Sequence, residues 1–575
     1  MKHVQLAIKK SWHFLRRLRQ VVGRRTILVL LLLLIAIPAR VALLREPLNS
    51  DDASFRYAAV DIVNHNHVVQ IGGLPEPERG AHHQLRFGIV LPVAAAIAVW
   101  GDSFVAYYLW PLFFSFVAIV SVFLLLRMIV GDRLAFLASL VHIVNPLEVQ
   151  YSSILLTNLP TAVVVLAYVV LITRESKETE PEQSNGLEDM SKLSIGFLCG
   201  LLLTWTYLLR ISAPITVVPA ILLCFLAKRN RRIILVSLVF LCVAVLFEQI
   251  FYMILGGKFG YRFMSVKGLF VLSTSGFSRY DNAVDYILRY PKAVWIFSRS
   301  YCVTIIFCLA LFFHCYVIVF TRTLFLRAVA LCGLFNFALF SFSLVEPLSK
   351  GFATLPPMSR YIQLFLLTSV LCIPWGMRHL AQLVYSCQLA KMFAGSDAGD
   401  DRNASRLRVT AHYLVLTACF LAFFVPMTRS SFRLPGRLLS TKHGTYLPIL
   451  CGINEIMESG KSKSVEVVGT VASLDAINMF DRLPGNKSIV WRKMPLEDCM
   501  RLMEEGTAML FLMDSWREYY NLRYLEEPEA SRMAKKLEKL ERIAAQDYEV
   551  VHRNKRFLLS KSRNLRRINV IEPGL

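Results

Sequence analysis

Charged residues are scarce in this sequence. Asp, Glu, Lys and Arg make up 18% of its 575 residues, whereas hydrophobic residues make up 55%. A typical soluble domain holds about 25% charged residues. The mean hydropathy of this sequence, +0.49, is also far more apolar than a soluble domain requires. The composition therefore excludes an ordinary soluble protein. It predicts a polytopic membrane protein built on repeated apolar runs of about 20 residues.

Acidic residues are scarcer than basic ones, at 41 against 64, which leaves a net charge of +23. A nucleic-acid-binding protein gathers its basic residues on one face, but here they are distributed among short loops between apolar runs. Residues 1–25 hold eight Lys or Arg and no acid, which predicts a cytoplasmic N-terminal segment, 1–26. The basic excess thus indicates membrane orientation, and no nucleic-acid partner is expected.

Metal-type cysteine spacing and internal repeats are also lacking. Most of the twelve cysteines lie inside apolar runs such as "LVFLCVAVLF" and "LFFHCYVIVF", where they act as small hydrophobic residues. No internal sequence repeat is evident, which weakens the transporter architectures that are built from two related halves.

Apolar runs recur from residue 27 to residue 426 and predict about eleven transmembrane helices. With this count, short basic connections such as "AKRNRR" lie on the cytoplasmic side, as the positive-inside rule requires. The run 85–101 is short and has Pro92 near its middle, so we expect it to lie in the external interface. The candidate spans are 27–44, 104–126, 134–150, 157–173, 193–209, 213–227, 233–256, 293–320, 326–345, 360–376 and 409–426.

Residues 427–575 change character. Apolar stretches "SVEVVGTVA" and "TAMLFLM" frame helical patterns such as "LEDCMRLMEEG" and "PEASRMAKKLEKLERIAAQ", and "YEVVHRNKRFLLSK" indicates a hairpin. With the N-terminus in the cytoplasm, an odd number of spans places this part on the external side of the membrane. The expected fold is an all-α polytopic membrane domain over 27–426, followed by a small extracytoplasmic α/β domain.

The first external loop, 45–103, begins with an acid pair in "LNSDDASFRYAA". One interpretation is purely structural: Ser50 caps a helix, Asp51 and Asp52 favour its positive end, and Asp52 pairs with Arg56. The other is catalytic, since a carboxylate in hydrogen-bond reach can take the proton of an acceptor hydroxyl. A second carboxylate would orient the first or help to hold a divalent cation. A site serving a membrane-embedded donor and a water-borne acceptor must lie at this depth.

The order of these features resembles the first-loop signature of GT-C glycosyltransferases. The features are a basic N-terminus, a first span, an acid pair, Ala, an aromatic residue and a small residue. These enzymes use polyprenyl-phosphate sugars and include protein O-mannosyltransferases and lipid A aminoarabinose transferases. The resemblance covers roughly residues 25–380. Four further stretches are similar to that group: "HHQLRFGIVLPVAAAIAVWGDSFVAYYLWPL", "ASLVHIVNPLEVQYSSILLTNLP", "GFLCGLLLTWTYLLRISAP" and "PPMSRYIQLFLL".

The resemblance implies roles for the acid pair. Asp51 matches the catalytic aspartate, the general base, and Asp52 matches the neighbouring acid. At "TNLP" many relatives carry an acid where this chain has Asn158, which puts a metal site using that loop in doubt. His82 and His83 would be metal ligands or acceptor contacts, or simply solvated loop residues. No cofactor is expected with certainty, and a divalent cation stays open.

A departing lipid phosphate needs cations near its developing charge, and arginine suits that geometry. Cations at the external ends of spans are candidates for binding this phosphate, because an unpaired charge next to lipid is costly. The alternative is that they extend to the lipid headgroups, as basic residues at helix ends also do. Glu248 would pair with one of these arginines or contact a sugar hydroxyl, and Arg56, His82 and His83 are further acceptor or sugar contacts. The candidate phosphate-binding residues are Arg210, Lys258, Arg262, Arg360 and Tyr361.

The sequence thus predicts an inverting membrane glycosyltransferase that moves a sugar from a polyprenyl-phosphate donor to an extracytoplasmic acceptor. Inversion follows because one base and one direct displacement suffice. A bacterial inner membrane is favoured over the endoplasmic reticulum. The alternatives are a transporter or lipid flippase, a non-catalytic scaffold, and a glycan ligase using a diphosphate-linked donor.

Overall fold

The computed structural model divides into two compact units. One holds Met1–Pro47, Ser54–Val271 and Gly276–Arg433, and the other holds Leu434–Leu575 with Leu48–Ala53 and Leu272–Ser275. The structure describes residues 23–41, 50–65, 85–101, 103–152, 154–174, 186–256, 259–264, 278–280, 284–285, 288, 304–342, 352–354, 362–386, 464–470, 488–505, 510–514, 527–553 and 557–562.

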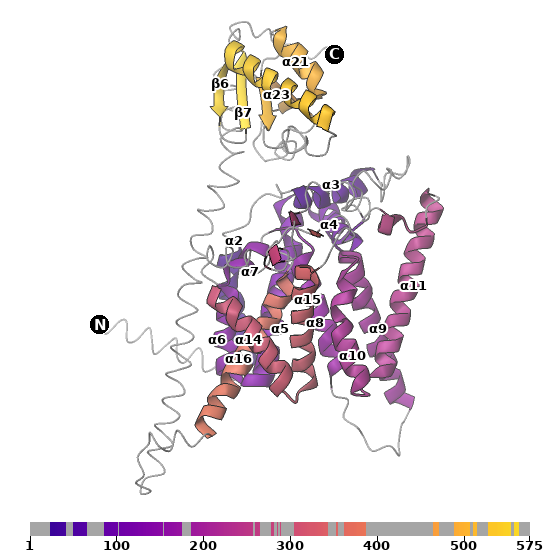
Figure 1. The fold of residues 1–575 in the computed structure, drawn as a ribbon. Helices are drawn as coiled ribbons and strands as arrows, with labels where there is room; N and C mark the ends of the chain where they lie inside the picture. The colour runs from indigo at the N-terminus through magenta and orange to yellow at the C-terminus, as the bar shows by residue number, and fades with distance from the viewer. Residues whose placement is uncertain are drawn as a thin grey trace, which may run out of the picture. The chain divides into compact units, whose positions relative to one another are not determined.

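The first unit is a helical bundle (Figure 1). The same unit holds two short strands, β1 (Ser278–Tyr280) and β2 (Phe352–Thr354), which pair antiparallel with each other. Its helices are α2 (Arg24–Val41), α3 (Ser50–His65), α4 (Phe87–Trp100), α5 (Phe104–Val130), α6 (Asp132–Ile143), α7 (Pro146–Ser152), α8 (Asn158–Thr173), α9 (Gly186–Leu209), the 3₁₀ helix η2 (Ala213–Val217), α10 (Val218–Leu226), α11 (Arg231–Gly256), α14 (Thr304–Phe320), α15 (Leu324–Phe342) and α16 (Gln363–Ser386). Helix α3 crosses the division, since its residues up to Ala53 are assigned to the other unit.

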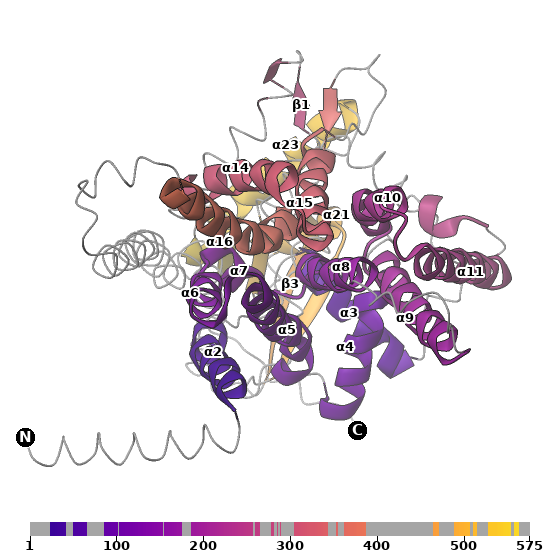
Figure 2. The same cartoon turned by 90° about the horizontal axis from the view of Figure 1, so that it is seen from below.

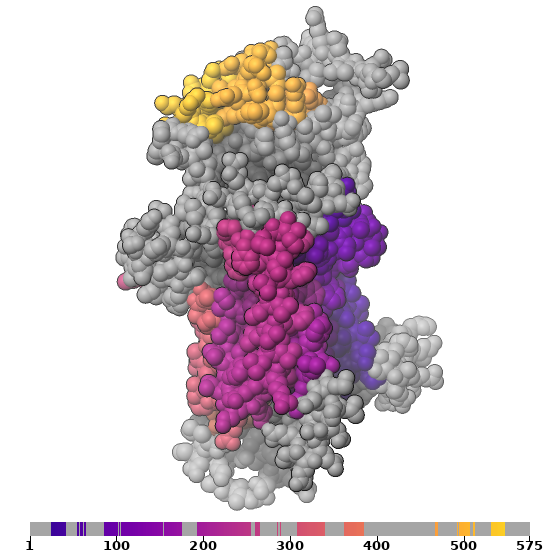
Figure 3. Space-filling model, turned by 90° about the vertical axis from the view of Figure 1, so that its right-hand side faces the viewer, coloured from indigo at the N-terminus to yellow at the C-terminus, as the bar shows by residue number. Residues whose placement is uncertain are grey.

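Four helices in the described part of the chain are long and apolar enough to cross a membrane, and they belong to α5, α9, α11 and α16. Shorter apolar helices accompany them, including α4, α8, α14 and α15. The outward side chains of α11 are strongly apolar, with Val239 62%, Phe247 72% and Ile254 76% exposed. Figure 3 shows this magenta side of the bundle. Such a surface suits lipid rather than water, so the fold is that of a multi-pass membrane protein.

The prediction of one span over 134–150 is wrong. The segment forms two helices, because α6 ends at Ile143 and α7 begins at Pro146. Proline disfavours helical backbone in the residue before it, and that residue, Asn145, instead accepts a hydrogen bond from the Leu147 N–H at 3.1 Å through its side-chain oxygen. Most other predicted spans match helices within a few residues, and 409–426 lies outside the described residues.

Close packing joins α9 to α11. A Cβ added at Gly200 would lie 2.6 Å from the Cβ of Phe240, and one at Gly196 would lie 2.9 Å from the Cβ of Val236. Small residues four apart let two helices approach in lipid, where van der Waals packing replaces the hydrophobic drive. Without these glycines the two helices would have to separate.

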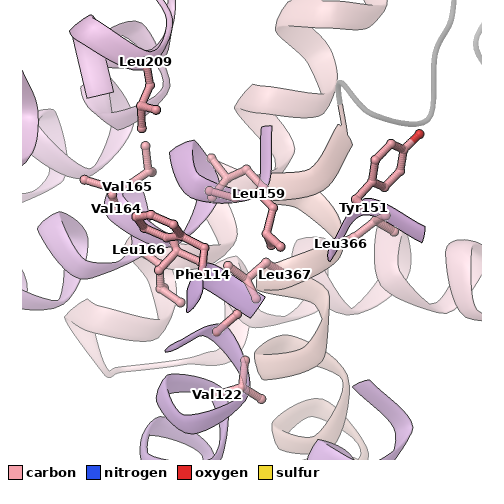
Figure 4. Close-up of a cluster of buried hydrophobic side chains, with 14 of the residues drawn as sticks. Phe114, Val122, Tyr151, Leu159, Val164, Val165, Leu166, Leu209, Leu366 and Leu367 are labelled. Carbon is pink, nitrogen blue, oxygen red and sulfur yellow. The ribbon is translucent and has the colours of Figure 1, made fainter. Parts of the chain in front are cut away.

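Helix α8 is the centre of the bundle (Figure 2). It contacts α5, α9, α15 and α16, and its side chains Leu159, Val165 and Leu166 are buried in the main apolar cluster (Figure 4). Asn230, which lies between α10 and α11, caps the end of α8, because its amide donates to the Ile172 carbonyl at 2.8 Å. Likewise Arg40 of α2 donates to the Ile143 carbonyl that ends α6, at 2.5 Å. These bonds satisfy carbonyls that a helix end leaves without partners.

The second unit contains a five-stranded mixed sheet with the order β4-β3-β5-β7-β6. The predicted hairpin is confirmed, because β6 and β7 pair antiparallel, whereas β3 pairs parallel with both β4 and β5. The strands are β3 (Ser464–Thr470), β4 (Ser488–Met494), β5 (Leu510–Asp514), β6 (Tyr548–Arg553) and β7 (Phe557–Ser562).

Two amphipathic helices, α21 (Leu496–Glu504) and α23 (Glu527–Asp547), cover one face of this sheet. Val468 and Phe511 are register partners on β3 and β5, and both join Cys499 of α21 and Leu540 of α23 in one buried cluster. Because side chains alternate along a strand, the helices pack on the face to which these two residues point. The side of the membrane on which this unit lies stays a prediction.

Candidate functional site

The predicted acid pair lies on a helix of its own. Helix α3 begins at Ser50, so Asp51 and Asp52 stand in its first turn, where backbone N–H groups favour negative charge. Figure 1 shows α3 and α4 at the same end of the helical unit. The side chains of both aspartates lie outside the described residues, so their predicted roles stay predictions.

Arg56, one turn after the acid pair, is a buried cation rather than a surface one. It is 8% exposed, its Nε donates to the Tyr107 hydroxyl of α5 at 2.8 Å, and its guanidinium lies 4.8 Å from the centre of the same ring. A buried charge is costly without partners, and Tyr107 supplies both a hydrogen bond and a cation–π contact. This pair therefore fixes α3 to the first turn of α5.

A second arginine, which the sequence analysis missed, contacts α3 at Phe55, the residue before Arg56. Arg86 immediately precedes α4, is half-buried, and holds its guanidinium 5.5 Å from the ring centre of Phe55. Its Nη1 also donates to the hydroxyl of Thr157 at 3.3 Å. The signal that could have found it is an arginine at the second position of the predicted interfacial run, 85–101.

Helix α4 is joined to the end of α9. Pro92 lacks an N–H, which leaves the carbonyl of Gly88, four residues earlier, without its helical partner. The indole Nε1 of Trp205 donates to that carbonyl at 3.1 Å. A Cβ on Gly88 would come within 2.7 Å of the Leu209 backbone nitrogen, so only glycine permits this approach. This joint between α4 and α9 places Arg210, the residue after Leu209, close to the beginning of α4.

Arg210 is half-buried and stands just beyond α9, as predicted for a cation at a span end. Its backbone N–H donates to the Thr206 carbonyl, and its own carbonyl accepts from the Ala213 N–H, both at 2.9 Å. The chain then turns into η2, where Pro214 follows. The side chain thus leaves a fixed backbone position at the end of the helix.

Arg262 and Glu248 form a buried ion pair, the alternative that the sequence left open for Glu248. They are 2% and 7% exposed, and Arg262 Nη1 donates to Glu248 Oε1 at 2.8 Å. Tyr207 donates its hydroxyl to Glu248 Oε2 at 2.5 Å, and Tyr252 donates to Oε1 at 3.3 Å. The carboxylate therefore receives hydrogen bonds on both oxygens.

The same guanidinium caps α9. Arg262 Nη2 donates to the carbonyls of Tyr207 and Leu208 at 2.9 and 3.1 Å, and its Cζ lies 4.6 Å from the ring centre of Tyr207. These carbonyls are among the last of α9, which a helix end leaves without intrahelical partners. Arg262 thus holds the turn 259–264 against the end of α9.

The remaining predicted site residues, His82, His83, Lys258, Arg360 and Tyr361, lie outside the described residues. Within the residues that the structure does describe, no group of three or more His, Cys, Asp or Glu side chains is placed to hold a metal ion. The described part of the site is therefore a set of cations around one end of the bundle.

Comparison with known proteins identifies the fold. The sequence matches neither a protein-family profile nor a curated protein. In structure, the chain is similar to ArnT from Cupriavidus metallidurans bound to undecaprenyl phosphate, with a TM-score of 0.54, 12% identity, and 95% of this chain and 99% of that chain covered. The apo state of ArnT aligns with a TM-score of 0.50 at 12% identity, over 94% and 98% of the two chains.

A weaker likeness is to the apo oligosaccharyltransferase of Archaeoglobus fulgidus, at a TM-score of 0.49 and 11% identity, over 88% of this chain and 72% of that one. The likeness to ArnT, and not this weaker one, shows that the chain has the GT-C fold, and it confirms the expected resemblance at the level of fold.

Proposed function

We propose that this chain is an integral-membrane glycosyltransferase that moves a sugar from a polyprenyl-phosphate donor to an extracytoplasmic acceptor with inversion. The observation that carries the proposal is the position of the acid pair: Asp51 and Asp52 open a short helix that follows the first apolar helix, and Arg56 and Tyr107 anchor this helix to the bundle. The GT-C fold supports it, since ArnT was solved with undecaprenyl phosphate.

In this mechanism Asp51 is the general base. Its carboxylate accepts the proton of the acceptor hydroxyl as that oxygen attacks the anomeric carbon, and the bond from this carbon to the donor phosphate breaks. One direct displacement inverts the anomeric centre. Asp52 orients Asp51 or helps to hold a divalent cation. Anchoring by Arg56 and Tyr107 holds α3, the helix that carries the acid pair, on α5, and a fixed position of the catalytic element is what proximity catalysis requires.

The leaving phosphate needs fixed cations, and the half-buried arginines meet this requirement better than the buried Arg262. Arg86 and Arg210 are held at the joint between α4 and α9 and retain partial exposure. Lys258, Arg360 and Tyr361 are proposed beside them from the sequence pattern. Arg262 already donates to Glu248 and to two carbonyls, so its first role is to fix the end of α9.

The proposed topology places the N-terminus in the cytoplasm, about eleven spans across the membrane, and residues 427–575 on the external side beside the acceptor. A bacterial inner membrane is the proposed location, with a polyprenyl lipid as donor.

The test uses the full chain in detergent. Native mass spectrometry should detect a copurifying polyprenyl phosphate, and the protein should release labelled sugar from a polyprenyl-phosphate sugar to an acceptor extract. Uptake of a solute into proteoliposomes without any sugar transfer would instead support a transporter. Transfer from a diphosphate-linked glycan alone would support a ligase.

A further inference from the structure

Gln363 is a buried amide at the beginning of α16. It is the first residue of α16 and is 2% exposed, and neither its Oε1 nor its Nε2 has a hydrogen-bond partner within the described parts of the chain. A buried polar group left unsatisfied costs stability, and an amide carries two donors and an acceptor that all need partners. Such a side chain at the N-terminus of a long helix requires an explanation.

The face of α16 that carries Gln363 is known from its neighbours. Residues three and four apart lie on one side of a helix, so Gln363 shares a face with Leu366 and Leu367. Figure 4 shows Leu367 toward Leu159 of α8 and Leu366 toward Tyr151 of α7, all within one apolar cluster. The contact between α8 and α16 agrees. The opposite side of α16 is different.

On that opposite side, Thr368 binds His314 of α14, with 2.9 Å between the Thr368 hydroxyl and His314 Nε2. Phe365 stacks on the same imidazole, with ring centres 4.7 Å apart. The polar groups of that face are therefore mutually satisfied. Gln363 shares the other face, whose Leu367 lies toward Leu159 at the beginning of α8.

The beginning of α8 belongs to the candidate site. Leu159, the second residue of α8, lies toward Leu367 of α16, which follows Gln363 by one helical turn (Figure 4). Two residues before it, Thr157 accepts the hydrogen bond from Arg86, which in turn covers Phe55 of α3. The N-terminal end of α16 also carries the positive end of its helix dipole, which favours an anion nearby. Gln363 is thus on the face of α16 that packs on α8, at the helix end whose dipole favours an anion.

We propose that Gln363 binds a hydroxyl group of the donor sugar and so selects an uncharged, hydroxyl-bearing sugar. The inference rests on the proposed transferase function. An amide can donate to and accept from one hydroxyl, whereas a sugar carboxylate or amine at that position would meet no counter-charge from Gln363. A site whose buried polar group needs a substrate hydroxyl rejects analogues that lack it.

Gln249 of α11 provides a matched control. It is also a buried glutamine, 3% exposed, and its amide likewise lacks a hydrogen-bond partner among the described residues. It lies on a helix that contacts α9 and α10, away from the α8–α16 contact. Replacing either glutamine removes one unsatisfied amide, but only Gln363 is expected to affect sugar recognition.

The experiment measures lipid binding to the full chain in detergent. The probes are undecaprenyl phosphate alone and undecaprenyl phosphate carrying glucose, mannose or a pentose, and the proteins are the wild type, Gln363→Leu, Gln363→Met and Gln249→Leu. The wild type should bind at least one sugar-loaded lipid more tightly than the bare phosphate. Both Gln363 variants should lose that preference by tenfold or more and bind undecaprenyl phosphate within twofold of the wild type. Gln249→Leu should keep the preference.

Gln363 variants that keep the wild-type preference, that weaken both kinds of lipid equally or that fail to fold while Gln249→Leu folds would overturn the inference. So would a wild type that binds undecaprenyl phosphate but prefers no sugar-loaded lipid. A wild type that binds no polyprenyl phosphate at all would overturn the proposed function, and with it this inference. The two failures are therefore distinguishable.

Discussion

Arg56 of α3 donates its Nε hydrogen to the Tyr107 hydroxyl of α5 at 2.8 Å, with its guanidinium 4.8 Å from the centre of the same ring. The pair joins the helix of the acid pair to the first long apolar helix after it. Because both side chains are buried, the bond is shielded from water. In the proposed mechanism, it holds in place the helix that carries Asp51.

Tyr107→Phe should therefore lower kcat about tenfold and leave the KM for the donor nearly unchanged. The change removes a hydrogen bond to a charged group, worth about 1.5–3 kcal/mol, while the ring remains for the cation–π contact. Steady-state kinetics at saturating donor measure the effect. Tyr168→Phe is the control, because it removes another buried hydroxyl bond, to Ser237 at 3.1 Å, far along α8. Equal kinetic loss in both variants would show that Tyr107 acts only through general stability.

Glu248→Gln should destabilise the helical unit by about 3–5 kcal/mol, since breaking a buried ion pair leaves Arg262 charged and unpaired. Thermal unfolding in detergent measures this loss, and the double variant Glu248→Gln with Arg262→Gln should recover part of it.

The same variant decides the role of Arg262. If Arg262 is mainly a cap for α9, Glu248→Gln should not tighten binding of undecaprenyl phosphate. Tighter binding in that variant would mean that the guanidinium, once released from Glu248, contacts the donor phosphate.

Gly200→Ala should lower stability by about 1–3 kcal/mol, because its Cβ would lie 2.6 Å from the Cβ of Phe240. Separation of α9 from α11 would also move Arg210, so transfer activity should fall with stability. Leu198 lies on the same helix and is 46% exposed. Leu198→Ala is therefore the control and should be nearly neutral. A neutral Gly200→Ala would contradict the close approach of these helices.

In the second unit, a hydrogen bond from Lys536 and its positive charge lower the pKa of the exposed Glu497 carboxyl below its usual 4.5. A carboxyl whose pKa is lowered on folding stabilises the fold above its unfolded pKa, and this contribution is lost as the pH falls through the folded pKa. Glu497→Gln should therefore lower stability slightly at pH 7 and have no effect well below pH 4.5. Unfolding curves at both pH values measure this, and Lys536→Gln should abolish the difference.

Much of the fold follows from the sequence because apolar length and period are local signals. Helix α8 matches the expected span 157–173 within one residue, and the hairpin of β6 and β7 was readable from its alternating pattern. The break between α6 and α7 was missed, although Pro146 marks it, because the surrounding residues are apolar enough to look like one span.

The site was less predictable, since its important relationships join residues far apart in the sequence. Arg86 looks like an ordinary loop residue until Phe55 and Thr157 are placed around it. The same holds for Gln363, because its burial and its lack of a partner among the described residues are properties of packing. Arg262 and Glu248 were both recognised as unusual, but only the fold shows how completely they satisfy each other.

The most direct test of the account is the transfer rate of Asp51→Asn, with Asp52→Asn beside it, in purified full-length protein that retains undecaprenyl phosphate binding. A general base contributes roughly 10²–10⁴ in rate. The account predicts a loss of that size for Asp51→Asn with the donor affinity unchanged, and a smaller loss for Asp52→Asn. Wild-type transfer by Asp51→Asn would contradict it.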